Sequence, residues 1–150
     1  MKIEKSITIR KDPKTVFEYL RITRNQDNFS VWNMADPEMN KMYRGTDGTV
    51  GFIYGWDSKN KNVGAGEQEI TGIKDGKSIE YEIKFFRPIQ NTGISKFQID
   101  ESGDNSSSVT WSFNSPSKFP YSLLAPIFRK MMGKDIQKGL GNLKTILEKK

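Results

Sequence analysis

The segment Ser78–Phe85 reads SIEYEIKF, and apolar and charged residues alternate along it without a break. The apolar residues are Ile79, Tyr81, Ile83 and Phe85. The charged residues between them are Glu80, Glu82 and Lys84. Successive side chains of a β-strand point to opposite faces, so this segment predicts a strand with one buried face and one solvent-exposed face. Such strands are typical of an antiparallel sheet.

Similar alternation on either side predicts more strands. In TVGFIYGW, residues 49–56, Phe52, Tyr54 and Trp56 fall on one face. Asp75-Gly76 indicates a two-residue hairpin turn. The strands are expected at residues 2–10, 40–46, 49–57, 63–74, 79–85, 92–100 and 109–113. Most are joined by short turns, so the sheet is predicted to be antiparallel.

Three segments are predicted to be helical. Asp12-Pro13 starts a short helix, with Asp12 as N-cap and Pro13 at the first position. A second short helix is expected from the polar stretch Thr23–Asn28, which leads into Phe29 and Trp32, and Asp36-Pro37 is expected to end it. The last segment has apolar residues at steps of three and four, which predict an amphipathic helix over about 127–148. Pro126 is expected to prevent this helix from starting before residue 127, because a proline ring clashes with the carbonyl group four residues earlier in a helix. The apolar stripe along one face of this helix consists of Met132, Ile136, Leu140, Leu143 and Leu147.

Composition excludes several classes of function. The length of 150 residues predicts a single domain that spans residues 1–150. The sequence contains no cysteine and no histidine. Catalysis through a Ser-His-Asp or Cys-His arrangement is therefore excluded, and we expect no metal and no cofactor. The net charge of +6 is scattered rather than clustered, so a nucleic-acid partner is not expected. We predict a cytoplasmic monomer or weak dimer without a signal peptide or integral membrane segment.

One long helix must cover a sheet of about seven strands, and two arrangements satisfy this requirement. The aromatic side chains of the inner face can fill the core completely. Alternatively, the sheet curls around the helix and leaves a cavity between them. Glycines such as Gly51, Gly55, Gly64 and Gly66 would help the sheet to bend.

Four segments carry a resemblance to a known family: GTVGFIYGW (48–56), GAGEQEITGI (64–73), SIEYEIKFFRP (78–88) and MMGKDIQKGLGNLKTILE (131–148). Together they resemble the polyketide cyclase/dehydrase-like branch of the SRPBCC superfamily, which includes START and birch-pollen-allergen-like proteins. The resemblance implies an α+β helix-grip fold: a curved seven-stranded antiparallel sheet around a long C-terminal helix, with two short helices after the first strand. It also implies a hydrophobic cavity for lipids, sterols, polyketides or other apolar metabolites.

The predicted ligand-binding residues face this cavity or its entrance. They are Trp32, Phe52, Tyr54, Trp56, Gln68, Tyr81, Ile83, Phe97, Trp111, Phe113, Phe128, Met131 and Met132. Gln68 shares the frame of Ile70 and could hold a ligand carbonyl or hydroxyl, or be satisfied within the protein. Trp32 could line the entrance or dock its helix on the sheet. Asp135 is expected to make a structural hydrogen bond or ion pair.

Three functions are consistent with these residues. The first is a carrier or binder of a small hydrophobic molecule. The second is a polyketide cyclase or dehydratase in which Tyr54, Tyr81 or Gln68 orients an enol. The third is a stress-related protein-interaction module with a filled core and an exposed apolar patch.

Overall fold

The computed structural model describes the main chain of residues 2–87, 90–115 and 121–150, and their side chains except those of residues 121–131. Over these residues the chain forms seven strands, two α-helices and one 3₁₀ helix. In chain order they are β1 (Lys2–Ile9), α1 (Pro13–Arg21), η1 (Thr23–Asn28), β2 (Asn40–Arg44), β3 (Ile53–Asp57), β4 (Ala65–Lys74), β5 (Ser78–Arg87), β6 (Asn91–Glu101), β7 (Ser107–Asn114) and α2 (Tyr121–Glu148). The expected element order is confirmed.

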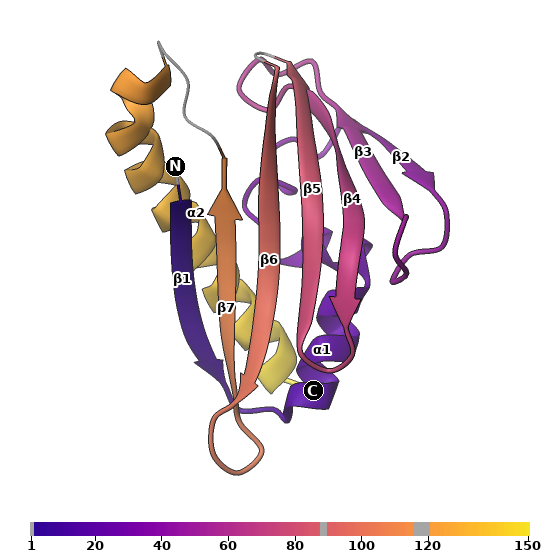
Figure 1. The fold of residues 1–150 in the computed structure, drawn as a ribbon, viewed down its shortest axis with the longest axis vertical. Helices are drawn as coiled ribbons and strands as arrows, with labels where there is room; N and C mark the ends of the chain where they lie inside the picture. The colour runs from indigo at the N-terminus through magenta and orange to yellow at the C-terminus, as the bar shows by residue number, and fades with distance from the viewer. Residues whose placement is uncertain (1, 88–89, 116–120) are drawn as a thin grey trace.

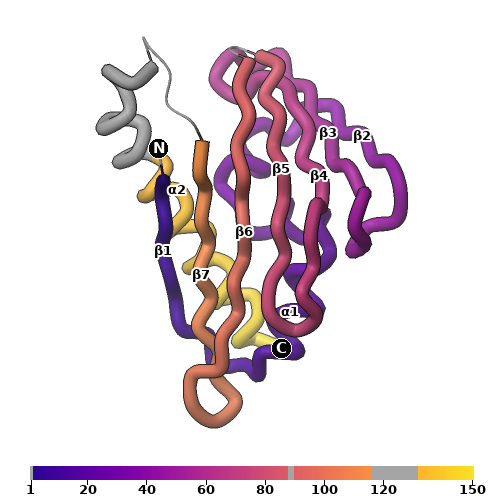
Figure 2. The backbone as a smooth tube through the Cα atoms, viewed as in Figure 1, coloured from indigo at the N-terminus to yellow at the C-terminus, as the bar shows by residue number. Residues whose placement is uncertain are grey.

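The described strands form one antiparallel sheet in the order β1-β7-β6-β5-β4-β3-β2. The first strand pairs with the last, and the chain through α1 and η1 then leads to β2 at the opposite edge. Figures 1 and 2 show α2 crossing behind β1, β7 and β6, with α1 behind the ends of β4 and β5. Both helices therefore lie on the same face of the sheet, here called the inner face. The α+β helix-grip prediction is confirmed.

The amphipathic stripe of α2 packs into the core as its spacing predicts. Ile136, Leu140 and Leu143 are fully buried, and Leu147 is almost so. Burying side chains of this size stabilises a fold by about 1.5–3 kcal/mol each. At the start of α1, Asp12 accepts hydrogen bonds from the main-chain N–H and the hydroxyl of Thr15, at 3.1 and 2.6 Å. The predicted N-cap is therefore confirmed.

Several predicted boundaries were wrong. The second short helix ends at Asn28, as η1, rather than continuing to Asp36-Pro37. Helix α2 begins at Tyr121, so Pro126 lies inside it; an internal proline removes one main-chain hydrogen bond, and the helix continues past it. The β4–β5 hairpin has a three-residue loop, because Lys74 pairs with Ser78 across residues 75–77. Strand β3 begins at Ile53 rather than residue 49, and residues 45–52 form a longer connection after β2.

Candidate functional site

On β3, β5 and α2, the burial of inward-facing side chains decreases from the α1 end of the sheet toward the opposite end, although Ile3 and Phe113 stay buried at that end. Along β5, Ile79 is fully buried, whereas Ile83 and Phe85 are only partly buried. Along α2, Ile136 is fully buried, while Met132 one turn earlier is only partly buried. Inward-facing apolar side chains therefore keep some accessible surface at this end, as expected for the wall of a cavity.

Burial decreases in the same direction along β3 and the residue just before it, Phe52. Phe52 and Tyr54 are both 2% exposed, whereas Trp56, two residues further, is only partly buried. Trp56 and Phe85 are in edge-to-face contact, with ring centroids 5.9 Å apart, and Phe85 contacts Phe113 in the same way at 6.3 Å. Trp56, Phe85 and Phe113 are called the aromatic wall below.

Two glycines leave room for the aromatic wall. A Cβ atom on Gly66 would lie 2.6 Å from the Trp56 ring, and one on Gly93 would lie 2.6 Å from the Phe113 ring. The absence of a side chain at these positions allows each ring to lie close against the neighbouring strand. The glycines therefore help to set the shape of the wall.

Phe97 and Trp111 lie in the buried half of the inner face. Their ring centroids are 4.8 Å apart, and the Trp111 indole N–H donates to Ser95 Oγ at 3.1 Å. Phe97 is fully buried and Trp111 is 4% exposed. These two predicted site residues form the packed base of the inner face.

Trp32 docks the segment after η1 on α2 and β7. Its indole N–H donates to Asp135 Oδ2 at 3.2 Å, and its ring contacts Trp111 edge to face at 5.9 Å. The docking alternative for Trp32 and the structural bond expected of Asp135 are therefore both observed. Trp32 is only partly buried, so part of the residue remains accessible.

Tyr54 belongs to a polar cluster at the β2–β3 side of the inner face. Its hydroxyl donates to Asp27 Oδ1 at 2.6 Å, and that carboxylate also accepts from Asn33 at 3.0 Å and from Lys41 at 3.0 Å. Burial, followed by the bond to the carboxylate, raises the pKa of Tyr54 above its ordinary value. Asp27 was missed by the sequence reasoning, because the polar stretch of η1 has no period that assigns it to a face.

Tyr81 is fully buried, and its hydroxyl points away from the aromatic wall toward α1. The hydroxyl lies 3.5 Å from the carbonyl oxygen of Leu20. Burial raises the pKa of Tyr81 above its ordinary value. Both predicted tyrosines therefore stay protonated at neutral pH, and each contacts a group of the protein itself.

Gln68 faces inward between Tyr54 on β3 and Ile83 on β5, as its strand parity predicts. The residue is 8% exposed. Within the described part of the chain, its side chain makes no hydrogen bond. Its two cross-strand partners each stand one inward position from a member of the aromatic wall, Trp56 on β3 and Phe85 on β5.

The remaining predicted residues are less informative. Met132 packs against the core at the partly buried end. The side chains of Phe128 and Met131 lie outside the described residues. Phe85, which completes the aromatic wall, was omitted from the predicted site, although its parity with Ile83 was a sufficient signal.

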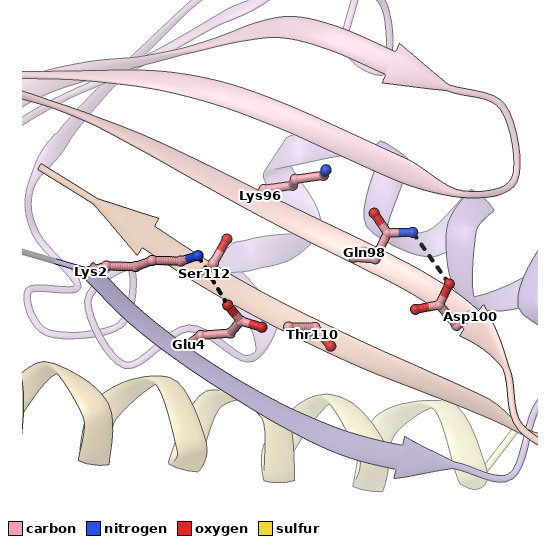
Figure 3. A pocket seen from close by; sticks show the side chains of 7 residues that line it. All are labelled: Lys2, Glu4, Lys96, Gln98, Asp100, Thr110 and Ser112. Carbon is pink, nitrogen blue, oxygen red and sulfur yellow. Dashed lines mark hydrogen bonds and ion pairs between the residues drawn. The ribbon is translucent and has the colours of Figure 1, made fainter.

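The outer face carries a hollow of a different kind, shown in Figure 3. It has a volume of about 340 Å³ and lies over β1, β7 and β6. Small side chains on β7 form its floor, and longer ones on the flanking strands form its walls. The lining residues are Lys2, Glu4, Lys96, Gln98, Asp100, Thr110 and Ser112. All are polar or charged, so this hollow does not suit an apolar molecule.

Among the described residues, no cluster of three histidine, cysteine, aspartate or glutamate side chains could hold a metal ion. In the same part of the chain, no helix has the length and apolarity that crossing a bilayer requires.

The sheet that curls around α2 and the partly buried inner face define the class as a helix-grip protein. The chain belongs to the polyketide cyclase / dehydrase and lipid transport family, whose sequence profile matches residues 1–148. The SRPBCC resemblance is thereby confirmed. No curated protein matches the chain.

Solved structures share the fold at low sequence identity. Protein MLL2253 from Mesorhizobium loti is 10% identical, with a TM-score of 0.72 over 99% of this chain and 98% of that one. Protein CV1439 from Chromobacterium violaceum is 14% identical, with a TM-score of 0.68 over 98% and 96% of the two chains. Ara h 8.0201 is 13% identical, with a TM-score of 0.62 over 100% and 99%. These similarities establish the fold alone.

Proposed function

We propose that this protein binds a small apolar molecule between the inner face of the sheet and α2. The observation that carries the proposal is the aromatic wall, where Trp56 and Phe85 face inward and yet are only partly buried. Large apolar side chains normally lose nearly all contact with solvent when they face a filled core. The family description, which includes lipid transport, supports the same class of ligand.

The polar groups near the wall favour binding over acid–base chemistry. A general base must be able to take up a proton near neutral pH. The tyrosine hydroxyls of the candidate site have raised pKa values, so they act as donors, and Tyr54 already donates to Asp27. The cyclase alternative would need Tyr54 or Tyr81 to leave its present partner and reach a substrate.

The test begins with native and denaturing mass spectra of freshly purified protein, followed by titration with pyrene, an uncharged fluorescent hydrocarbon. We expect an apolar molecule that is lost on denaturation, or saturable binding of pyrene to the emptied protein. Ile83→Trp should abolish that binding, because the larger side chain fills the space beside Gln68.

Ile94→Trp is the matched control. Ile94 is 48% exposed and pairs with Glu82, whose side chain belongs to the outer set of β5. The same enlargement there should leave binding unchanged. A protein that carries no copurifying molecule and does not bind pyrene would refute the proposal and favour the interaction-module alternative.

A further inference from the structure

The polar side-chain groups on the inner face differ in whether they have a hydrogen-bond partner within the protein. Five aromatic side chains of the predicted ligand-binding set carry an N–H or O–H, and each of these groups lies close to a protein oxygen. The pairs are Trp32 with Asp135, Tyr54 with Asp27, Trp56 with the Val63 carbonyl, Tyr81 with the Leu20 carbonyl, and Trp111 with Ser95. Gln68 has no such partner within the described residues.

Gln68 is also placed where a ligand would meet it. It stands opposite Tyr54 and Ile83, and the next positions along the same strands are Trp56 and Phe85 of the aromatic wall. Buried polar side-chain atoms that have no contact with solvent and no hydrogen-bond partner occur elsewhere, on α1, on η1 and at Ser30. The amide of Gln68 is not among them, so it keeps contact with accessible space although the residue is 8% exposed.

Charge on the inner face limits which ligand can use this amide. The cation nearest to Tyr54 is Lys41, and it is already bonded to Asp27 at 3.0 Å. Charged side chains do occupy inward frames. Lys5, on the far edge strand β1, is exposed and has its stem against Gly133, whereas Lys41 on β2 pairs directly with Trp56 but is bonded to Asp27. A buried carboxylate needs a counter-charge or several donors. Among the described residues near Gln68, the cation of Lys41 is already neutralised by Asp27, so no free counter-charge is identified there.

We propose that Gln68 recognises the ligand, and that the cavity selects an uncharged apolar molecule with a hydroxyl or carbonyl group over a hydrocarbon or a carboxylate of the same shape. The amide offers both a donor and an acceptor, so it can pair with either neutral group. This inference rests on the proposed function and specifies its ligand class.

The test compares three probes of nearly the same shape: pyrene, 1-pyrenemethanol and 1-pyrenecarboxylate. Dissociation constants are measured by fluorescence titration for the wild-type protein and for Gln68→Leu and Glu69→Leu. Glu69 is the next residue on β4 and faces outward, so its variant is the matched control. We expect the wild type to bind pyrenemethanol about five- to tenfold more tightly than pyrene, the effect of one neutral hydrogen bond. Pyrenecarboxylate should bind more weakly than pyrenemethanol.

Gln68→Leu should remove the preference for pyrenemethanol over pyrene, whereas Glu69→Leu should keep it. Equal binding of pyrene and pyrenemethanol by the wild type, or a preference that survives Gln68→Leu, would overturn the inference while leaving the proposed function intact. Tighter binding of pyrenecarboxylate would overturn it in favour of a cation such as Lys5. If no probe bound, the proposed function would fail and the inference with it.

Discussion

Two glycines in α2 make a matched pair for testing how closely the helix packs on the sheet. Replacing a glycine in a helix interior with alanine stabilises the helix by about 1 kcal/mol. At Gly141 a new Cβ would have no described atom within 4 Å, so Gly141→Ala should gain that full amount. At Gly139 the same Cβ would lie 2.9 Å from the Trp111 ring and 3.5 Å from the Phe29 carbonyl oxygen.

The Trp111 ring cannot easily move away from this new methyl group. It contacts the rings of Phe29, Trp32 and Phe97 at 5.8, 5.9 and 4.8 Å between centroids, and its N–H is bonded to Ser95. Overpacking a filled core of this kind costs about 1–3 kcal/mol. Gly139→Ala should therefore be about 1–3 kcal/mol less stable than Gly141→Ala, and equal to or less stable than the wild type.

Urea denaturation followed by circular dichroism at 222 nm measures both variants against the wild type. For a chain of this length, the gain at Gly141 corresponds to a rise in Tm of about 2–4 °C. The reasoning would be refuted if the two variants were equally stable within about 0.5 kcal/mol, since the helix would then not be held against Trp111.

Two further predictions concern polar contacts. The Lys144 ammonium and the Arg10 main chain hold the pKa of Glu148 down to about 2, from an ordinary 4.5. The stability that Glu148 contributes is therefore complete above pH 4.5 and is lost as the pH falls toward 2, so thermal melts of Glu148→Gln and the wild type should converge over that range. Tyr54→Phe removes the hydroxyl bonded to Asp27 and should destabilise the fold by about 1.5–3 kcal/mol in urea melts; an unchanged midpoint would show that the bond contributes nothing.

The strands and their faces were predictable because their signal is local. The alternation in Ser78–Phe85 requires only that neighbouring side chains point to opposite sides of a strand, and the structure places Ile79 and Tyr81 in the core as expected. The cap at Asp12 and the stripe of α2 were predictable for the same reason, since each depends on residues within one or two helical turns. The inward orientation of Gln68 was predictable because residues two apart on a strand point to the same face, and Ile70 faces the core.

Contacts between distant segments were not predictable. Asp47 accepts from the main-chain N–H groups of Thr23 and Arg24, at 2.7 and 3.1 Å, and so caps η1 from a loop 24 residues away. No periodicity links a loop carboxylate to a helix that precedes it by that distance. The bond between Tyr54 and Asp27 is non-local in the same way.

The sequence by itself determined which side chains face inward, because strand and helix periods act between near neighbours. The tertiary structure alone decided how fully each of them is buried and which polar groups find partners. Those outcomes depend on the register between strands and on how the sheet curls around α2. Both bring together residues that are far apart in the chain. Periodicity predicted that Trp56 and Gln68 would face the interior. Only the assembled sheet left Trp56 partly accessible and Gln68 without a partner among the described residues.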